Sequence, residues 1–318
     1  MIMPKRFAMI GAAGYIAPRH MKAIKDTGNE LVALLDPYDG IGIIDSYFPH
    51  ADFFMEPERF DRHLDKLSRQ PDKKIDYVSI CSPNYLHDAH IRLALRNDAH
   101  AICEKPLVLN PWNIDSLEEI EKESGKKIYT IFQLRLHESI LKLKRQIEEG
   151  PKDKIYDIDL TYITSRGNWY DWSWKGDSSR SGGIATNIGV HFFDMLTWIF
   201  GAVENHKVHL NEIHKAGGFM QLKSANVRWF LSIDSNDLPD SVKEQKRTYR
   251  SIQMDGKEIE FSDGFTELHT ESYKKILSGE GFGLSHAKSS IQTVFDIRNS
   301  KISEVSDDYH PFVKKTKK

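Results

Sequence analysis

The sequence predicts an α/β protein of two domains: a doubly wound parallel sheet first, then an α+β domain with a large, mainly antiparallel sheet. Three observations support this prediction. Residues 6–36 have the order strand, glycine turn, helix, strand and acid. Strands then alternate with helices as far as residue 132, which is typical of a parallel sheet. From residue 156 onward, strands follow one another with short turns, which indicates antiparallel pairing.

The first of these stretches has the pattern of a dinucleotide-binding Rossmann domain. An apolar strand over 6–10 leads into a turn of small residues, a helix over 18–27 and a second strand over 30–35. Such a turn lets the backbone approach a pyrophosphate, and the helix start offers free N–H groups to it. The match to G-x-G-x-x-G is degenerate, because alanine and isoleucine replace its second and third glycines. The turn residues expected to bind the cofactor are Gly11, Ala13, Gly14, Tyr15 and Ile16.

Asp36, at the end of the second strand, indicates which dinucleotide binds. A carboxylate at this position accepts hydrogen bonds from the adenine ribose hydroxyls and repels a 2′-phosphate. The next residues, Pro37-Tyr38-Asp39, provide no arginine or lysine for that phosphate. NAD is therefore the expected cofactor, rather than NADP. The alternative is that Asp36 only caps the loop that follows it.

Two polar loops follow the strands expected over 75–81 and 99–103. The first is Ser82-Pro83-Asn84-Tyr85-Leu86-His87, and the second is Glu104-Lys105-Pro106. Lys105 would lie at a strand's carboxyl end, where open α/β sheets bind ligands, and the proline after it favours extended backbone. A lysine held there can deprotonate or polarise a hydroxyl. The alternative is a solvated surface lysine. The other elements expected in this half are a helix to residue 97, a helix over 111–124 and a strand over 127–132.

These two loops and a third block resemble the glucose-fructose oxidoreductase / inositol dehydrogenase / MocA (Gfo/Idh/MocA) family. The third block, residues 181–194, is similar to that family's G-G-G…D-x-G-x-H-x-x-D stretch. The resemblance covers nearly the whole chain and implies that Lys105 and His191 flank the reacting carbon as the catalytic residues. Asn187 replaces the family's aspartate, which leaves Lys105 and His191 to share the proton chemistry. The cofactor contacts implied in the two loops are Ser82, Pro83, Asn84, His87, Glu104 and Lys105.

Three further stretches, residues 11–20, 165–176 and 183–189, resemble one bacterial branch of this family. Members of that branch oxidise C3 of UDP-N-acetyl-2-amino-2-deoxy-D-glucuronate (UDP-GlcNAcA), a step toward diacetamido uronic acids of surface polysaccharides such as O-antigen. Asn187 is ordinary in that branch. The resemblance therefore implies a UDP-sugar uronate substrate and a downstream aminotransferase. It also implies a homo-oligomer, with a tetramer favoured, formed through the outer face of the second domain's sheet.

The second half of the chain is expected to carry that sheet. An Asp255-Gly256 pair between its last two strands predicts a hairpin turn. The domains are expected at 1–133, which binds NAD, and 134–318, which binds substrate and oligomerises. The expected strands are 156–164, 203–210, 219–222, 227–233, 248–254 and 257–261, with one helix within 181–201 and another over 285–300.

An aromatic and basic segment over 166–175 suits a sugar nucleotide. Aromatic rings stack on sugar or uracil faces, and cations pair with a carboxylate or diphosphate. The alternative is that these rings pack beneath a long loop. Arg135 is a second candidate anion partner, unless it forms a structural ion pair. The expected substrate-binding residues are Lys105, Arg135, Arg166, Trp169, Tyr170, Ser173, Lys175, Asn187 and His191.

Composition excludes several other classes of protein. The net charge of −2 over 318 residues implies no bulk attraction to nucleic acid, and no apolar run approaches a membrane span. Two cysteines are too few for a disulfide framework, which fits a reducing cytoplasm. The histidines show no i, i+4 pairing with acids, so no metal site is expected. The remaining alternatives are another sugar or polyol dehydrogenase of the same family, or a non-catalytic NAD-sensing regulator.

Overall fold

The computed structural model describes residues 3–243, 246–259, 267–304 and 308–316. The chain forms two compact units, one of Met1–Leu136 with Thr266–Lys288 and one of His137–Phe265 with Ser289–Lys318. The domain boundary expected at residue 133 lies close to Leu136, where the chain first leaves the first unit. The structure differs in the segment Thr266–Lys288, which the sequence prediction placed in the second domain and which belongs to the first unit.

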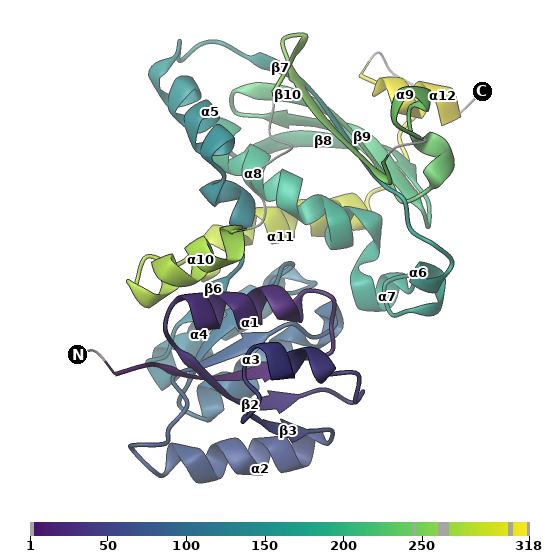
Figure 1. The fold of residues 1–318 in the computed structure, drawn as a ribbon. Coiled ribbons are helices and arrows are strands. Elements are labelled where there is room, and N and C mark those ends of the chain that lie inside the picture. The colour runs from purple at the N-terminus through teal and green to yellow at the C-terminus, as the bar shows by residue number, and fades with distance from the viewer. Residues whose placement is uncertain (1–2, 244–245, 260–266, 305–307, 317–318) are drawn as a thin grey trace. The chain divides into compact units, whose positions relative to one another are not determined.

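The first unit is built on a six-stranded sheet in the order β3-β2-β1-β4-β5-β6, with every neighbouring pair parallel (Figure 1). This is the strand order of the dinucleotide-binding Rossmann fold, and it confirms the predicted fold class. All four residues of β4 are buried, as expected for a strand covered on both faces. The strands are β1 (Arg6–Ile10), β2 (Glu30–Leu35), β3 (Asp52–Phe54), β4 (Tyr77–Ile80), β5 (His100–Cys103) and β6 (Ile128–Thr130).

The order of the strands reverses between β1 and β4, and this reversal positions the two loops of interest. Ligands of open α/β sheets bind at such a switch point, beyond the strands' carboxyl ends. The glycine turn follows β1, and the Ser82 loop follows β4. A Cβ on Gly11 would lie 2.6 Å from backbone atoms of Cys81 and Ser82, so only glycine lets the two loops approach this closely.

Helices surround this sheet, and their ends follow local sequence signals. Proline stands in the first turn of α1, α2 and α4, where its missing N–H costs nothing. Gly125 ends α4 in the left-handed conformation, with φ of 66°. The helices are α1 (Ala17–Asp26), α2 (Pro57–Ser68), α3 (His87–Arg96) and α4 (Pro111–Ser124).

Helix α10 (Leu268–Leu277) joins this unit although the chain reaches it only after most of the second unit. Its Tyr273 is fully buried, with its ring 5.8 Å from that of Phe7 on β1 and 5.6 Å from that of His20 on α1. Burying one aromatic side chain is worth roughly 2–3 kcal/mol, which explains why this segment packs with the first unit.

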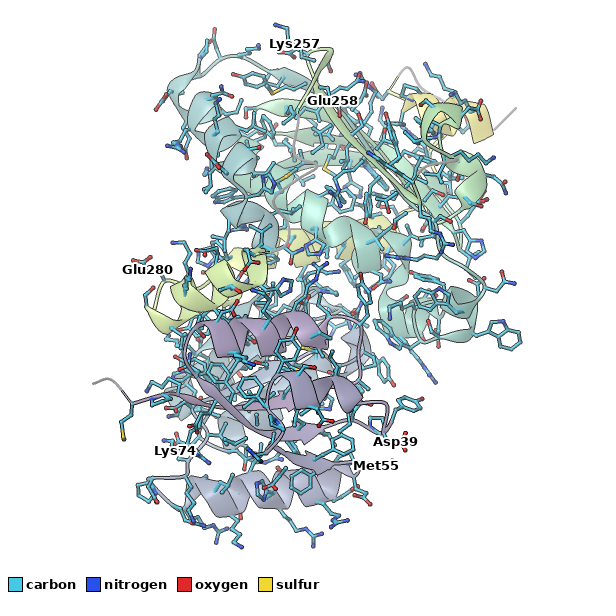
Figure 2. The ribbon with its side chains drawn as sticks, viewed as in Figure 1. Asp39, Met55, Lys74, Lys257, Glu258 and Glu280 are labelled. Atoms are coloured by element: carbon cyan, nitrogen blue, oxygen red, sulfur yellow. The ribbon has the colours of Figure 1, made fainter. Side chains whose placement is uncertain are left out.

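The second unit carries a six-stranded sheet in the order β12-β11-β7-β10-β9-β8. The β7–β10 pair is parallel and the other pairs are antiparallel, so the sheet is mixed and mainly antiparallel, as predicted. Asp255 and Gly256 both have positive φ, which confirms the hairpin turn. Figure 2 shows Lys257 and Glu258 on the short strand after this turn; residues 260–261 of the strand expected here lie outside the described residues. The strands are β7 (Tyr156–Thr164), β8 (Val203–Asn211), β9 (Lys215–Leu222), β10 (Ala225–Ser232), β11 (Thr248–Met254) and β12 (Lys257–Glu258).

A helical stretch packs on the second sheet and carries the third sequence block. The helix expected within 181–201 is α8 (Val190–Phe200), and a π-helix at Ala185–Gly189 leads into it. The ring of Phe193 lies 5.2 Å from that of Trp229 on β10. The other helices of this unit are α5 (Glu138–Glu149), α6 (Trp169–Trp172), α7 (Ser178–Ser181), α9 (Asp240–Lys243) and α12 (Pro311–Thr316), and α11 (Leu284–Asn299) begins in the first unit. None of the helices in the described part of the chain is long and apolar enough to cross a membrane.

Two histidines with lowered pKa predict a loss of stability in mild acid. Burial lowers the pKa of His90 in the first unit, and that of His310 in the second, to about 4. Unfolded histidine titrates near 6.5, so the unfolded chain binds more protons below that pH, and stability falls as the pH drops from about 6.5 to 4. Each ring should destabilise its unit by roughly 2–3 kcal/mol at pH 4.

Thermal unfolding between pH 7 and 4 checks this prediction, and His310→Gln serves as the comparison. Nε2 of His310 lies 3.1 Å from Oγ1 of Thr161, and Nδ1 accepts the Phe312 N–H. Glutamine keeps the contact with Thr161 without titrating, so its melting temperature should fall less steeply with acid. A melting temperature that stays constant from pH 7 to 4.5 would contradict the prediction.

Candidate active site

The glycine turn after β1 leaves two backbone donors available at the start of α1. The amides of Gly11 and Ala12 donate to Leu35 O, that of Ala13 to Asp36, and that of Gly14 to Gly11 O. Among the described residues, the N–H groups of Tyr15 and Ile16 have no hydrogen-bond acceptor. They stand just before α1 begins, where a helix favours negative charge. This geometry fits a pyrophosphate.

Asp36, which follows β2, is buried and bonds to the same turn. Its Oδ2 accepts the Ala13 N–H at 2.9 Å, and its Oδ1 accepts the Tyr38 N–H at 3.0 Å. The second contact is the loop cap that the alternative interpretation expected. Each carboxylate oxygen still has a further lone pair for a ribose hydroxyl. Asp39 follows Asp36 along the loop after β2 (Figure 2), and it adds a second negative charge near that point. These residues fit NAD better than NADP.

Asp36→Ala should therefore narrow the preference for NAD over NADP. The variant loses a charge-assisted hydrogen bond to the ribose, which is worth roughly 1.5–3 kcal/mol, so NAD should bind about 10- to 150-fold more weakly. The affinity for NADP should fall less, because the variant also removes the repulsion between Asp36 and the 2′-phosphate of NADP. Calorimetric titration with both cofactors measures this, and Asp72→Ala, which changes an exposed aspartate elsewhere in the same unit, is the matched control. Equal binding of NAD and NADP by the unmutated protein would contradict the assignment.

The Ser82 loop and the Glu104-Lys105-Pro106 loop are tied together by His87. This ring is buried, with Nδ1 2.7 Å from Pro106 O and Nε2 2.9 Å from Ser82 O. Burial lowers the pKa of His87, against the effect of these two carbonyl groups. Asn84 is also buried, and Ser82 Oγ lies 2.8 Å from Nδ1 of His90. A neutral ring donates one N–H, so His87 bonds to one of these carbonyl groups and packs against the other, between the two loops.

Lys105 lies where the sequence predicted it, in the loop that follows β5. The Glu104 amide donates to Ile80 O at 3.0 Å, which extends the pairing of β5 with β4, and the Lys105-Pro106 peptide bond is cis. The Lys105 side chain is partly exposed, whereas Glu104 and Pro106 on either side of it are buried. A lysine flanked by buried neighbours is held by the fold, which distinguishes it from a freely solvated surface lysine.

Arg135 has a structural environment in the first unit. It is buried, with its guanidinium 4.9 Å from the ring of Phe132 and 5.2 Å from that of Phe282. It also donates to His286 O at 3.1 Å. Stacking between two rings and bonding to a carbonyl account for the charge without a ligand. These contacts hold Arg135 within the first unit, and its role as an anion partner stays a prediction.

The aromatic and basic segment lies in the second unit, and most of it is exposed. Trp169 is 53% exposed and Trp172 is 90% exposed, whereas Tyr170 is buried. Nζ of Lys175 lies 4.2 Å from the ring centre of Trp174 and 5.8 Å from that of Trp169. Two rings are therefore open for stacking, beside a cation. The hydroxyl of Ser173 donates to Tyr170 O within the segment, and Arg166 is exposed.

Asn187 connects this segment to the third sequence block. Its Nδ2 donates to the hydroxyl of Tyr170 at 2.8 Å, and burial raises the pKa of that tyrosine. Asn187 lies within the π-helix, and the partly exposed His191 lies one turn later in α8. π-helices are rare and occur frequently at functional sites. Tyr170, Asn187 and His191 thus belong to one unit, and Lys105 and the cofactor residues belong to the other.

Sequence reasoning missed one cluster in the first unit. His20, Glu104 and His269 bring three possible ligand atoms within 4.8 Å of one another, although no metal site was expected. The residues come from α1, the loop after β5 and α10, so no local spacing could reveal them. His20 and His269 both lie near the start of a helix, but this placement alone does not predict that they meet at Glu104.

Comparison with solved structures gives close matches over almost the whole chain. The WlbA (WbpB) dehydrogenase from Thermus thermophilus, solved with NAD and alpha-ketoglutarate, is 50% identical, with a TM-score of 0.94. The same dehydrogenase solved with NAD and UDP-GlcNAcA is 49% identical, with a TM-score of 0.93. Each match covers 97% of this chain and 99% of the other. The WlbA dehydrogenase from Bordetella pertussis, at 19% identity and a TM-score of 0.74 over 92% of this chain and 94% of that one, shares the fold.

Curated relatives are more distant. The D-glucoside 3-dehydrogenase of Escherichia coli (strain K12) is 26% identical over 218 residues, which is 67% of this chain and 59% of that protein. The match thus spans less than two thirds of that relative's length. Residues 5–132 match the oxidoreductase family's NAD-binding Rossmann fold, and residues 144–230 match its C-terminal alpha/beta domain. Together with the 50% identical solved structure, these matches show that the chain belongs to the Gfo/Idh/MocA family of NAD-binding oxidoreductases.

Proposed function

We propose that this protein is an NAD-dependent dehydrogenase that oxidises the C3 hydroxyl of UDP-GlcNAcA to the 3-keto sugar. The observation that carries the proposal is the 49% identity, over 97% of this chain, to a dehydrogenase solved with NAD and UDP-GlcNAcA. The residues support it independently. Tyr15 and Ile16 offer amides to a pyrophosphate, Asp36 suits the ribose of NAD, and Trp169 with Lys175 suits a sugar nucleotide.

Each candidate residue has a role in this reaction. Bound NAD would accept the hydride from C3. Lys105 takes the proton of the C3 hydroxyl and steadies the developing alkoxide, and His191 assists it. Asn187 orients Tyr170 through their hydrogen bond, and these two side chains line the substrate site. Arg166 and Lys175 are the cations for the uronate carboxylate or the diphosphate.

The assay must allow for reoxidation of the cofactor on the protein. The Thermus thermophilus dehydrogenase was solved with alpha-ketoglutarate as well as with NAD. We therefore propose to follow the reaction with and without a 2-oxo acid, by NADH absorbance and by analysis of the sugar product. Formation of the 3-keto product from UDP-GlcNAcA under either condition is the expected result. Its absence under both conditions would overturn the proposal.

The uronate carboxylate should contribute strongly to turnover. UDP-N-acetylglucosamine has a hydroxymethyl group instead, so it cannot form the charge-assisted pair with Arg166 or Lys175. Losing such a pair is worth roughly 1.5–3 kcal/mol, so its kcat/KM should be about 10- to 150-fold lower than that of UDP-GlcNAcA. Comparable values for the two sugars would contradict the uronate assignment. Lys175→Met and Arg166→Met, compared on both sugars, then identify the cation.

The wider assignments follow from the same proposal. A 3-keto sugar on the way to a diacetamido uronate requires an aminotransferase as the next enzyme, without a need for a stable complex. Two buried cysteines, both free, support a reducing cytoplasmic location. We also propose a homo-oligomer, with a tetramer favoured, and light scattering of the purified protein measures its size.

Two alternatives remain distinguishable by the same assay. A small-polyol dehydrogenase of the family would turn over inositol and ignore UDP-sugars. A non-catalytic NAD sensor would bind NAD without turnover of any substrate. The exposed ring of Trp169, which lies beside Lys175, and the exposed ring of Trp172 favour a larger, stacked substrate over a free polyol.

A further inference from the structure

A buried network of polar side chains surrounds the residue that precedes Lys105. Oε1 of Glu104 lies 2.9 Å from Nε2 of His20 and 3.0 Å from Nε2 of His269. On the other side of His20, Nδ1 lies 2.8 Å from the hydroxyl of Tyr273, which lies 2.6 Å from Oγ of Ser79. All five side chains are buried, and all five belong to the first unit. The network therefore joins α1, β4, the loop after β5 and α10.

The direction of each hydrogen bond follows from the charge of Glu104. Burial alone would raise the pKa of Glu104, but the bonds to His20 and His269 hold it well below its usual range. A carboxylate only accepts, so both histidines donate from Nε2. Burial lowers the pKa of His20, so its neutral ring accepts at Nδ1 from Tyr273. The Tyr273 oxygen in turn accepts from the hydroxyl of Ser79.

The second oxygen of Glu104 reaches the backbone of Lys105. Oε2 accepts the Lys105 N–H at 3.2 Å, while Oε1 is held by the two rings. On the far side of Lys105, Pro106 O lies 2.7 Å from Nδ1 of His87. The peptide group before Lys105 and the peptide group after Pro106 therefore both contact buried side chains. Glu104 thus links helices α1 and α10 to the backbone of this lysine.

Stability alone explains this network poorly. Removing a carboxylate from water costs several kcal/mol, and well-packed apolar residues of similar volume often give a more stable fold. Nδ1 of His269 is buried and has no hydrogen-bond partner in the described part of the chain. An unsatisfied buried group of this kind costs roughly 1–3 kcal/mol. A network that carries such costs beside a candidate catalytic lysine is better explained by function.

We propose that Glu104 is a positioning residue for Lys105, and that His20 and His269 are the two donors that hold its carboxylate in place. The proposal rests on the proposed function, in which Lys105 takes the proton of the substrate hydroxyl. Misplacing a catalytic group by about 1 Å can cost on the order of 100-fold in rate. Helix α10, which the chain adds to the first unit late in the sequence, thereby supports the reaction through His269.

The same three side chains are possible metal ligands, but their spacing is that of hydrogen bonds. Oε1 lies 2.9 and 3.0 Å from the two ring nitrogens. Around a tetrahedral zinc with bonds near 2.0–2.1 Å, neighbouring donor atoms lie roughly 3.3 Å apart. Stoichiometric zinc or another transition metal in the purified protein would therefore overturn the proposal.

A matched pair of variants at His269 tests the positioning role. Glutamine offers an N–H close to the place of Nε2, whereas leucine offers none. In a single turnover of UDP-GlcNAcA by the NAD-loaded protein, His269→Leu should slow hydride transfer by at least about 10-fold, and His269→Gln by less than about 3-fold. The Kd for NAD should change by less than about 2-fold in both. Equal rates for the two variants would overturn the proposal.

The pH dependence separates positioning from a general loss of structure. Glu104→Gln keeps the shape of the side chain and removes the negative charge beside Lys105. The acid limb of the kcat/KM profile should then move to lower pH, because a charge that favours the protonated lysine is gone. Damage to the fold alone would lower the rate equally at every pH. An acid limb in the same place as in the unmutated protein would contradict the role given to Glu104.

A measurement without substrate distinguishes failure of this inference from failure of the proposed function. The 13Cε resonance of Lys105, assigned by its loss in Lys105→Met, reports the surroundings of the side chain. It should shift in His269→Leu and keep its position in His269→Gln. An unchanged resonance in both overturns the positioning role. Absence of UDP-GlcNAcA turnover by the unmutated protein overturns only the proposed function.

Discussion

Lys105→Met should lower kcat by about 10²–10⁴-fold, because it removes the proton acceptor and the cation beside the developing alkoxide. The melting temperature and the affinity for NAD should stay nearly unchanged. The side chain is partly exposed, and the backbone on either side of it is held by Glu104 and His87. Steady-state kinetics with UDP-GlcNAcA, thermal unfolding and calorimetry with NAD measure the three quantities.

Two comparisons make this result interpretable. Lys122→Met changes an exposed lysine on α4 in the same unit and should leave all three quantities unchanged. His191→Asn should lose less activity than Lys105→Met if histidine only orients or relays. If Lys105→Met keeps more than about a tenth of the unmutated kcat, Lys105 is not the catalytic group, and His191 becomes the candidate base.

Gly11→Ala should destabilise the first unit and weaken NAD binding together. Gly11 has φ of 85°, which costs an alanine roughly 1–2 kcal/mol. The added Cβ would also lie 2.6 Å from three backbone atoms of Cys81 and Ser82, which cannot move as a flexible side chain does. Overpacking of this kind costs a further 1–3 kcal/mol or so. The melting temperature should fall by roughly 5–15 °C, and NAD should bind at least about 10-fold more weakly.

Gly28→Ala is the matched control for this effect. Gly28 has a similar φ of 74°, but a Cβ there would meet nothing within 4 Å. Gly28→Ala should therefore lower the free energy of unfolding only by the conformational cost, about 1–2 kcal/mol, and should keep its affinity for NAD. Similar melting temperatures and NAD affinities for the two variants would show that the contact with Cys81 and Ser82 is unimportant.

Most elements could be read from local sequence signals. The strands at Arg6–Ile10, Glu30–Leu35 and Tyr156–Thr164 have the predicted bounds, and α4 runs from Pro111 to Ser124 as expected. These signals are local because a strand's alternation, a proline in a first turn and a glycine stop act within a few residues. The motifs at Gly11–Ile16 and Glu104–Pro106 are equally local, and both follow strands as predicted.

The partners of Arg135 could not be predicted from local sequence signals. A cation that follows a strand could bind an anionic substrate or form an ion pair within the protein. The sequence offers no way to choose between these two roles. The rings of Phe132 and Phe282 are brought to it by packing, with Phe282 nearly 150 positions away along the chain. The helix expected within 181–201 is α8, whereas no local sequence signal predicted the π-helix that precedes it.

The sequence by itself determined the fold class, the glycine turn, the acid that suits NAD and the family motifs, because each depends on residues close together in the chain. Only the tertiary structure decided that β7 and β10 pair in parallel, that α10 belongs to the first unit, and that His20 and His269 meet at Glu104. These features join residues from about 70 to about 250 positions apart. Such contacts form when apolar faces are buried together, and burial depends on the whole packed unit rather than on any local pattern.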